Sequence, residues 1–200
     1  MTMRHGLALA PTPSRPPQPG DAMFLHGASV LDRVLQDLEE ANAQPCLTTG
    51  IYPCHVGMCI ETDAGTISVA EMQWPVCRIL RLDKWLDTYG TDQYWTAPMK
   101  TPLDTDEGRA LTAWWEARLG NWYDLPDLVQ LGIMGWWNSL CAKLHLPLSC
   151  TANAIAVKGV CSVNCAWAYE SLGRYIPSPL RQSPATIIGL PWLGTPIRIA

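Results

Sequence analysis

The sequence has little of what several classes of protein require. Charged residues make up only 16% of the chain, and a formal net charge of −4 leaves no basic surplus for a phosphate backbone, so nucleic-acid binding is not expected. No apolar run reaches the ~20 residues of a membrane-spanning helix, because polar residues interrupt the best candidate stretch, 128–142. Since 48% of the 200 residues are nevertheless hydrophobic, we expect one compact globular domain with a sizeable core.

We expect no export signal in this chain, and its cysteines are not closely paired. The apolar stretch 6–10 is shorter than the ~7–15 residues of a signal peptide, so we expect a cytoplasmic location or a place in a viral particle. No C-x-x-C pair occurs among the eight cysteines, which lie at 46, 54, 59, 77, 141, 150, 161 and 165. We therefore expect mostly reduced thiols, most of them small buried side chains, rather than disulfides.

Proline divides the chain into three parts. Prolines at 11, 13, 16, 17 and 19 predict an extended N-terminal arm over 1–18. The main domain is expected over 19–176, and the proline-rich tail 177–200 is expected to wrap irregularly over its surface. A helix predicted at 126–145 is apolar on nearly all sides, which indicates deep burial or a surface that meets lipid or protein. Both proline-rich termini and this helix could therefore contact a protein partner.

Periodicity within the main domain indicates a mixture of strands and helices. Strands are predicted at 22–25, 55–61, 66–72, 77–82 and 93–97. Helices are predicted at 29–40, 83–86, 104–119, 126–145 and 162–172. This pattern predicts an α+β domain.

Three short pieces carry the residue types of thiol catalysis. His55 begins an apolar strand, Glu71 lies sixteen positions later in the next strand, and Cys161 opens a helix. A helix N-terminus favours a thiolate and offers N–H groups for an oxyanion, an imidazole moves the proton, and a third polar residue orients the ring. Because a turn at 62–65 joins the two strands, they are expected to pair and to bring His55 beside Glu71.

Further motifs surround these residues in a fixed order. They are Pro19-Gly20-Asp21-Ala22-Met23-Phe24, Cys54-His55-Val56-Gly57-Met58, Val69-Ala70-Glu71, Leu80-Arg81-Leu82-Asp83-Lys84-Trp85-Leu86, Leu119-Gly120-Asn121-Trp122-Tyr123-Asp124 and Cys161-Ser162. Together, over residues 19–190, they resemble the YiiX-like group of permuted, NlpC-related papain-fold proteins. The resemblance implies a circularly permuted papain-like fold, with a small antiparallel β-barrel or sheet packed on helices. It also implies that the histidine precedes the cysteine in the chain.

The resemblance further implies a cysteine hydrolase that cleaves an amide or ester bond. Its substrate would be a cell-wall peptide, peptidoglycan or a lipid, and catalysis would pass through a covalent thioester-type intermediate. The positions that match the family are Cys161 as nucleophile, His55 as base and Glu71 as the orienting residue. Neither a cofactor nor a metal is expected.

Plainer alternatives stand beside this hypothesis. Taken singly, Cys161 would be a buried thiol, His55 a core or strand-edge histidine and Glu71 a solvated carboxylate. Zinc is the main chemical alternative, with Cys54, His55, Cys59, Cys161 and Cys165 as possible ligands. A structural component of an assembly such as a phage particle, with little or no catalysis, is the alternative from another class. Tryptophans at 74, 114, 115, 122, 136 and 137 could line a ligand groove or simply fill the core.

Overall fold

The structure is a computed structural model, and it describes residues 15–25, 53–62, 65–73, 75–88, 94–122, 161–177, 179 and 182–199. The helices predicted at 29–40 and 126–145 lie outside these residues, as does most of the N-terminal arm. None of the described helices has the length and apolar character of a membrane span.

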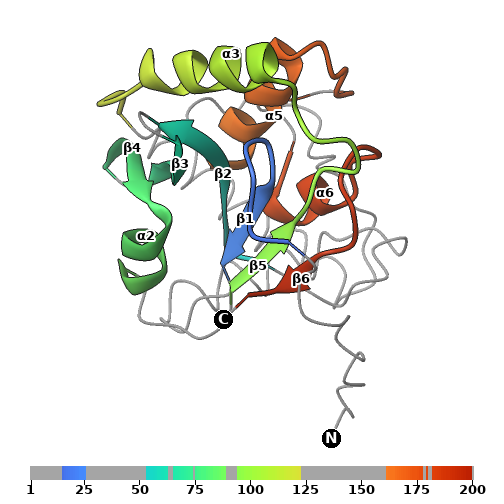
Figure 1. Ribbon diagram of the computed structural model, residues 1–200, viewed down its shortest axis with the longest axis horizontal. Coiled ribbons are helices and arrows are strands. Elements are labelled where there is room, and N and C mark those ends of the chain that lie inside the picture. The colour runs from blue at the N-terminus through green and yellow to red at the C-terminus, as the bar shows by residue number, and fades with distance from the viewer. Residues whose placement is uncertain are drawn as a thin grey trace, which may run out of the picture.

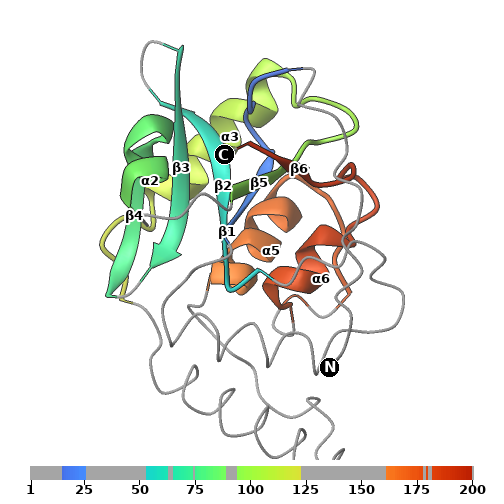
Figure 2. The ribbon, with the colours of Figure 1, turned by 90° about the horizontal axis from the view of Figure 1, so that it is seen from below.

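A six-stranded antiparallel sheet runs through the described part of the chain, in the order β4-β3-β2-β1-β5-β6 (Figures 1 and 2). The strands are β1 (Ala22–Leu25), β2 (His55–Thr62), β3 (Thr66–Gln73), β4 (Val76–Arg81), β5 (Tyr94–Ala97) and β6 (Ile197–Arg198). An antiparallel sheet packed on helices is therefore confirmed. The barrel form was wrong, because the edge strands β4 and β6 do not pair with each other and the two-residue β6 offers almost no edge for closure.

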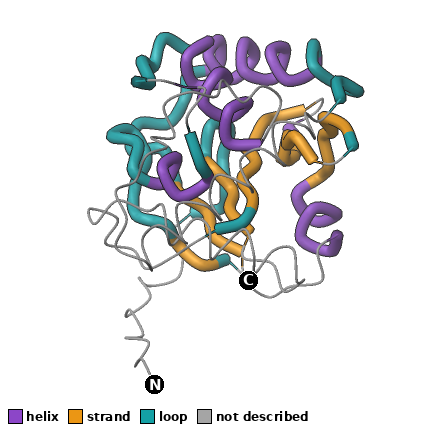
Figure 3. The backbone as a smooth tube through the Cα atoms, turned by 180° about the vertical axis from the view of Figure 1, so that it is seen from behind, coloured by secondary structure: helices purple, strands orange, loops and turns teal. Residues whose placement is uncertain are grey.

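Helices cover the two faces of the sheet unequally. They are α2 (Leu82–Thr88), α3 (Thr105–Glu116), α5 (Cys161–Ser171) and α6 (Pro184–Ile188). Side chains alternate between the faces of a strand, so Cys59 and Val69 pack with Trp85 of α2, whereas Met58 and Ala70 belong to the larger core with α3, α5 and α6. Seen from behind, α2 stands apart from the other helices, and α3 lies across the end of the strands (Figure 3).

Most predicted elements within these residues are confirmed, with small shifts at their ends. Asp104 caps α3 and Glu107 completes a capping box, but the helix ends at Glu116 rather than at 119. Three turn residues then lead to Gly120, whose φ of 77° suits a residue without a side chain. Leu82 begins α2 rather than ending a strand, so Asp83 lies in the first turn instead of capping it.

The C-terminal tail contributes to the core and to the sheet. Ser183 caps α6, whose Ile187 is fully buried, and β6 pairs with β5 through Trp95 opposite Arg198. The prediction of an irregular wrap over 177–200 was wrong for these elements. The prolines of the tail suggested irregular structure. Pro184, however, stands in the first turn of α6, where a missing N–H costs no helical hydrogen bond.

Candidate active site

Pairing between β2 and β3 brings His55 and Glu71 to one face of the sheet. Met58 lies opposite Ala70, so Gly57 lies opposite Glu71 and His55 follows on the same face, two residues away. Their side chains meet diagonally, with His55 Nε2 2.8 Å from Glu71 Oε2. The side-by-side placement expected from the turn at 62–65 is therefore present, while the catalytic role of the pair stays a prediction.

Glu71 is completely buried and is surrounded by hydrogen-bond donors. Its Oε2 also accepts a bond from Trp85 Nε1 at 2.6 Å, and its Oε1 lies 2.7 Å from both Nε and Nη2 of Arg78. Burial by itself would raise the pKa of Glu71, but His55, Trp85 and Arg78 together lower it from 4.5 to about 2. The side chain is therefore a carboxylate at neutral pH.

Cys161 approaches His55 from a different layer of the molecule. It is the first residue of α5, which packs along β2, and one turn further on Cys165 Sγ lies 3.9 Å from the carbonyl oxygen of Val56. Cys161 and His55 form a side-chain hydrogen bond. Both residues are buried, with exposed fractions of 6% and 7%. Since Glu71 occupies Nε2, Nδ1 is the ring nitrogen left for the thiol.

The charge state of His55 depends on both neighbours. Burial would lower the pKa of the imidazole, but the charges of Cys161 and Glu71 and the hydrogen bonds with them raise it from 6.5 to about 10. An imidazolium beside the Glu71 carboxylate is thus the favoured form of His55 at neutral pH. A thiolate beside an imidazolium is the form of cysteine that attacks carbonyl carbon.

Gly57 makes room for this arrangement. A Cβ added there would lie 2.7 Å from Val69 Cγ1 and 3.2 Å from the carbonyl oxygen of Ala70. We expect Gly57→Ala to destabilise the fold by about 1–3 kcal/mol, because neither the branched side chain nor the backbone can move away freely. Gly108→Ala is the control, since nothing lies within 4 Å of its added Cβ in α3 and it should stabilise the protein by about 0.5–1 kcal/mol. Urea unfolding of the two variants measures both effects, and an unchanged midpoint for Gly57→Ala would show that this packing does not need glycine.

The zinc site considered from the sequence does not assemble in the described part of the chain. Cys59 packs on the face that meets α2, Cys165 packs on the face that meets α5, and the sheet separates them. Among the described residues no three His, Cys, Asp or Glu side chains lie close enough to hold a metal ion. The five described cysteines are buried and form no disulfide, as expected for reduced thiols.

Two partners of Glu71 were not predicted as site residues. Trp85 lies inside one of the family-like motifs, but no role followed from its spacing, and Arg78 lies opposite Glu71 on β4. A signal for Arg78 existed in the strand pattern, because residues that pair across neighbouring strands share a face. Trp85 belongs to a helix beyond the sheet, and local periodicity does not reveal such a contact.

The tryptophans do not form one groove within the described residues. Trp115 is fully buried and packs edge-on against Trp114, over which the Arg118 guanidinium lies at 3.5 Å, whereas Trp122 is 75% exposed. Trp74 and the residues at 136 and 137 lie outside the described residues. Core packing therefore explains Trp115, and these contacts assign no ligand to the others.

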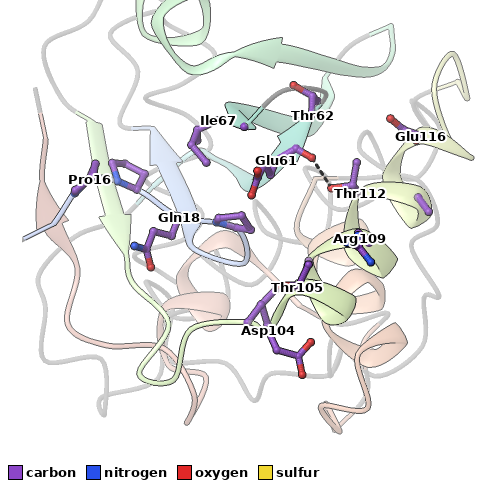
Figure 4. A pocket seen from close by; sticks show the side chains of 16 residues that line it. Pro16, Gln18, Glu61, Thr62, Ile67, Asp104, Thr105, Arg109, Thr112 and Glu116 are labelled. Carbon is purple, nitrogen blue, oxygen red and sulfur yellow. Dashed lines mark hydrogen bonds between the residues drawn. The ribbon is translucent and has the colours of Figure 1, made fainter.

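A separate groove of about 860 Å³ lies at the end of β2 that is distant from His55 (Figure 4). Residues 16–19 form one wall and the outer side of α3 forms another, with Thr112 Oγ1 bonded to the carbonyl oxygen of Glu61 between them. Neither His55, Glu71 nor Cys161 lines it. The groove is therefore distinct from the candidate active site.

These features define an α+β protein in which a helix-opening cysteine, a strand histidine and a buried glutamate come together. Comparison with known families finds none that matches the chain, and comparison with curated proteins finds no match either. Among solved structures, the chain is similar to the crystal structure of metalloprotein yiiX from Escherichia coli O157:H7, DUF1105. The two are 18% identical with a TM-score of 0.51, and the match covers 90% of this chain and 96% of that one. This likeness shows a YiiX-like fold.

Proposed function

We propose that this protein is a cysteine hydrolase that cleaves an amide or ester bond, with Cys161 as nucleophile, His55 as proton carrier and Glu71 as the residue that orients the imidazole. The observation that carries the proposal is the continuous line of contacts from Cys161 through His55 to the buried Glu71 carboxylate. We propose further that the fold is a circularly permuted papain-like one, because the histidine strand β2 precedes the cysteine helix α5 in the chain.

The proposed reaction has two halves. The Cys161 thiolate attacks the carbonyl carbon, and backbone N–H groups in the first turn of α5 stabilise the oxyanion that forms. The bond to the leaving nitrogen or oxygen then breaks, His55 gives that group a proton, and a thioester remains on Cys161. In the second half, His55 takes a proton from water, the resulting hydroxide attacks the thioester, and the acid product and the thiolate are released.

The similar protein yiiX is described as a metalloprotein, which raises the question of a metal here. The residues of this site do not suit one. Both Glu71 oxygens already accept bonds from cationic or donor-only groups, and among the described residues no third ligand joins His55 and Cys161. The proposed mechanism therefore uses no metal.

A chromogenic ester tests the proposal without knowledge of the natural substrate. With p-nitrophenyl acetate we expect a burst of about one equivalent of p-nitrophenolate, because acylation of an activated thiol outpaces hydrolysis of its thioester. Intact and peptide mass spectrometry should place the acetyl group on Cys161, and Cys161→Ala should abolish the burst. Cys165→Ser is the matched control, one turn along the same helix, and should retain the burst. A burst that survives Cys161→Ala would overturn the proposal, and the alternative of an assembly component would then lead.

A further inference from the structure

Trp85 meets the candidate active site through the N–H of its indole. The ring is fully buried, and Tyr94 packs against it with centroids 5.1 Å apart. Its Nε1 lies 2.6 Å from Glu71 Oε2, the same oxygen that faces His55 Nε2. Because the indole is buried and held by packing, water cannot readily replace this bond.

The donor properties of the indole restrict the protons on its neighbours. An indole N–H can only donate, so Glu71 Oε2 must accept from Trp85. A protonated Oε2 is a weak acceptor, and Arg78, which also can only donate, already occupies Oε1. The arrangement in which Glu71 is a neutral acid that donates to His55 is therefore disfavoured. An ionised Glu71 accepts from His55 as well, so Nε2 must carry a proton.

We infer that Trp85 is a positioning residue, whose indole N–H keeps Glu71 an acceptor and thereby fixes the His55 proton on Nε2, leaving Nδ1 directed to Cys161. This inference rests on the proposed function for its catalytic meaning, but the protonation of His55 exists whether or not the protein is a hydrolase. Trp85 bonds to Glu71, so it acts through that carboxylate.

Trp85→Phe removes the donor and keeps an aromatic ring beside Tyr94. Loss of a hydrogen bond to a charged group should slow iodoacetamide labelling of Cys161 about tenfold or more at pH 7. The ¹⁵N signals of His55 should also report a lower imidazole pKa and, above that pKa, a mixed tautomer of the neutral ring instead of protonation fixed at Nε2. Trp115→Phe is the matched control, because this buried indole Nε1 has no hydrogen-bond partner among the described residues. It should leave both readouts within about twofold of wild type.

A second variant separates the loss of the indole N–H donor from the loss of side-chain volume. Replacement of Trp85 by 3-benzothienylalanine keeps the bicyclic shape and substitutes sulfur for the N–H, and it should reproduce the Trp85→Phe effects on His55. Unchanged His55 signals in both variants would overturn the inference. If wild-type Cys161 proves unreactive, the proposed hydrolase fails, whereas the ¹⁵N titration still decides the role of Trp85.

Discussion

At pH 7, iodoacetamide should label Cys161 at least about tenfold faster in the wild-type protein than in His55→Ala, because the imidazolium that holds the thiolate is lost. His55 is the charged group in side-chain contact with Cys161, and its pKa of about 10 keeps it cationic at this pH. Peptide mass spectrometry after timed quenching gives the rate for each cysteine separately. His5→Ala, which changes a histidine outside the motifs, should leave the Cys161 rate unchanged.

The other cysteines serve as internal references in the same experiment. Burial raises the pKa of Cys77 to about 11 and raises those of Cys59 and Cys165 well above their usual value. These three should therefore label far more slowly than Cys161 at every pH below 9. If Cys161 labels no faster than Cys77, or if His55→Ala changes nothing, the imidazole does not activate the thiol and the hydrolase proposal loses its main support.

The pairing of His55 with Glu71 could be predicted because it depends on local chain geometry. A short turn between two alternating strands allows few registers, and the register present sets Gly57 opposite Glu71. Cys161 could be placed at a helix start by periodicity alone. Its approach to His55, more than a hundred residues away in the chain, followed only from the family resemblance.

What the sequence did not reveal depends on contacts between distant segments. β6 has two residues, too few for a pattern, and exists because Ile197 and Arg198 find the free edge of β5. The hydrogen bond from Trp85 to Glu71 joins helix α2 to strand β3 of the sheet. The apolar neighbours of Trp85 in α2 predict that it is buried, but they predict no hydrogen bond. The prediction of a barrel was wrong for a related reason, because closure of a sheet depends on how all its strands are staggered.

Glu71→Gln should lower the free energy of unfolding by about 3 kcal/mol at pH 7, because it removes a buried charge on which several donors converge. A glutamine keeps the shape of the side chain but offers one oxygen and one NH₂ group. Whichever way the amide turns, its NH₂ group faces the donors of Arg78 on one side or those of Trp85 and His55 on the other. Glu61→Gln, at an exposed carboxylate of β2, should stay within about 0.5 kcal/mol of wild type.

The pH dependence of the stability of Glu71→Gln, compared with that of wild type, tests the charge of Glu71. Its pKa is lowered from 4.5 to about 2 in the folded protein, so as the pH falls the unfolded chain binds this proton first. The contribution of the charge is therefore complete above the unfolded pKa of 4.5 and is lost as the pH falls towards 2. Urea unfolding at pH 7, 5, 4 and 3 should show a gap between wild type and Glu71→Gln that is constant down to about pH 5 and then shrinks. A gap that stays constant to pH 3 would mean that ionisation of Glu71 adds nothing to the stability of the fold. A carboxyl group that is not favoured in its ionised form could not stabilise an imidazolium beside Cys161.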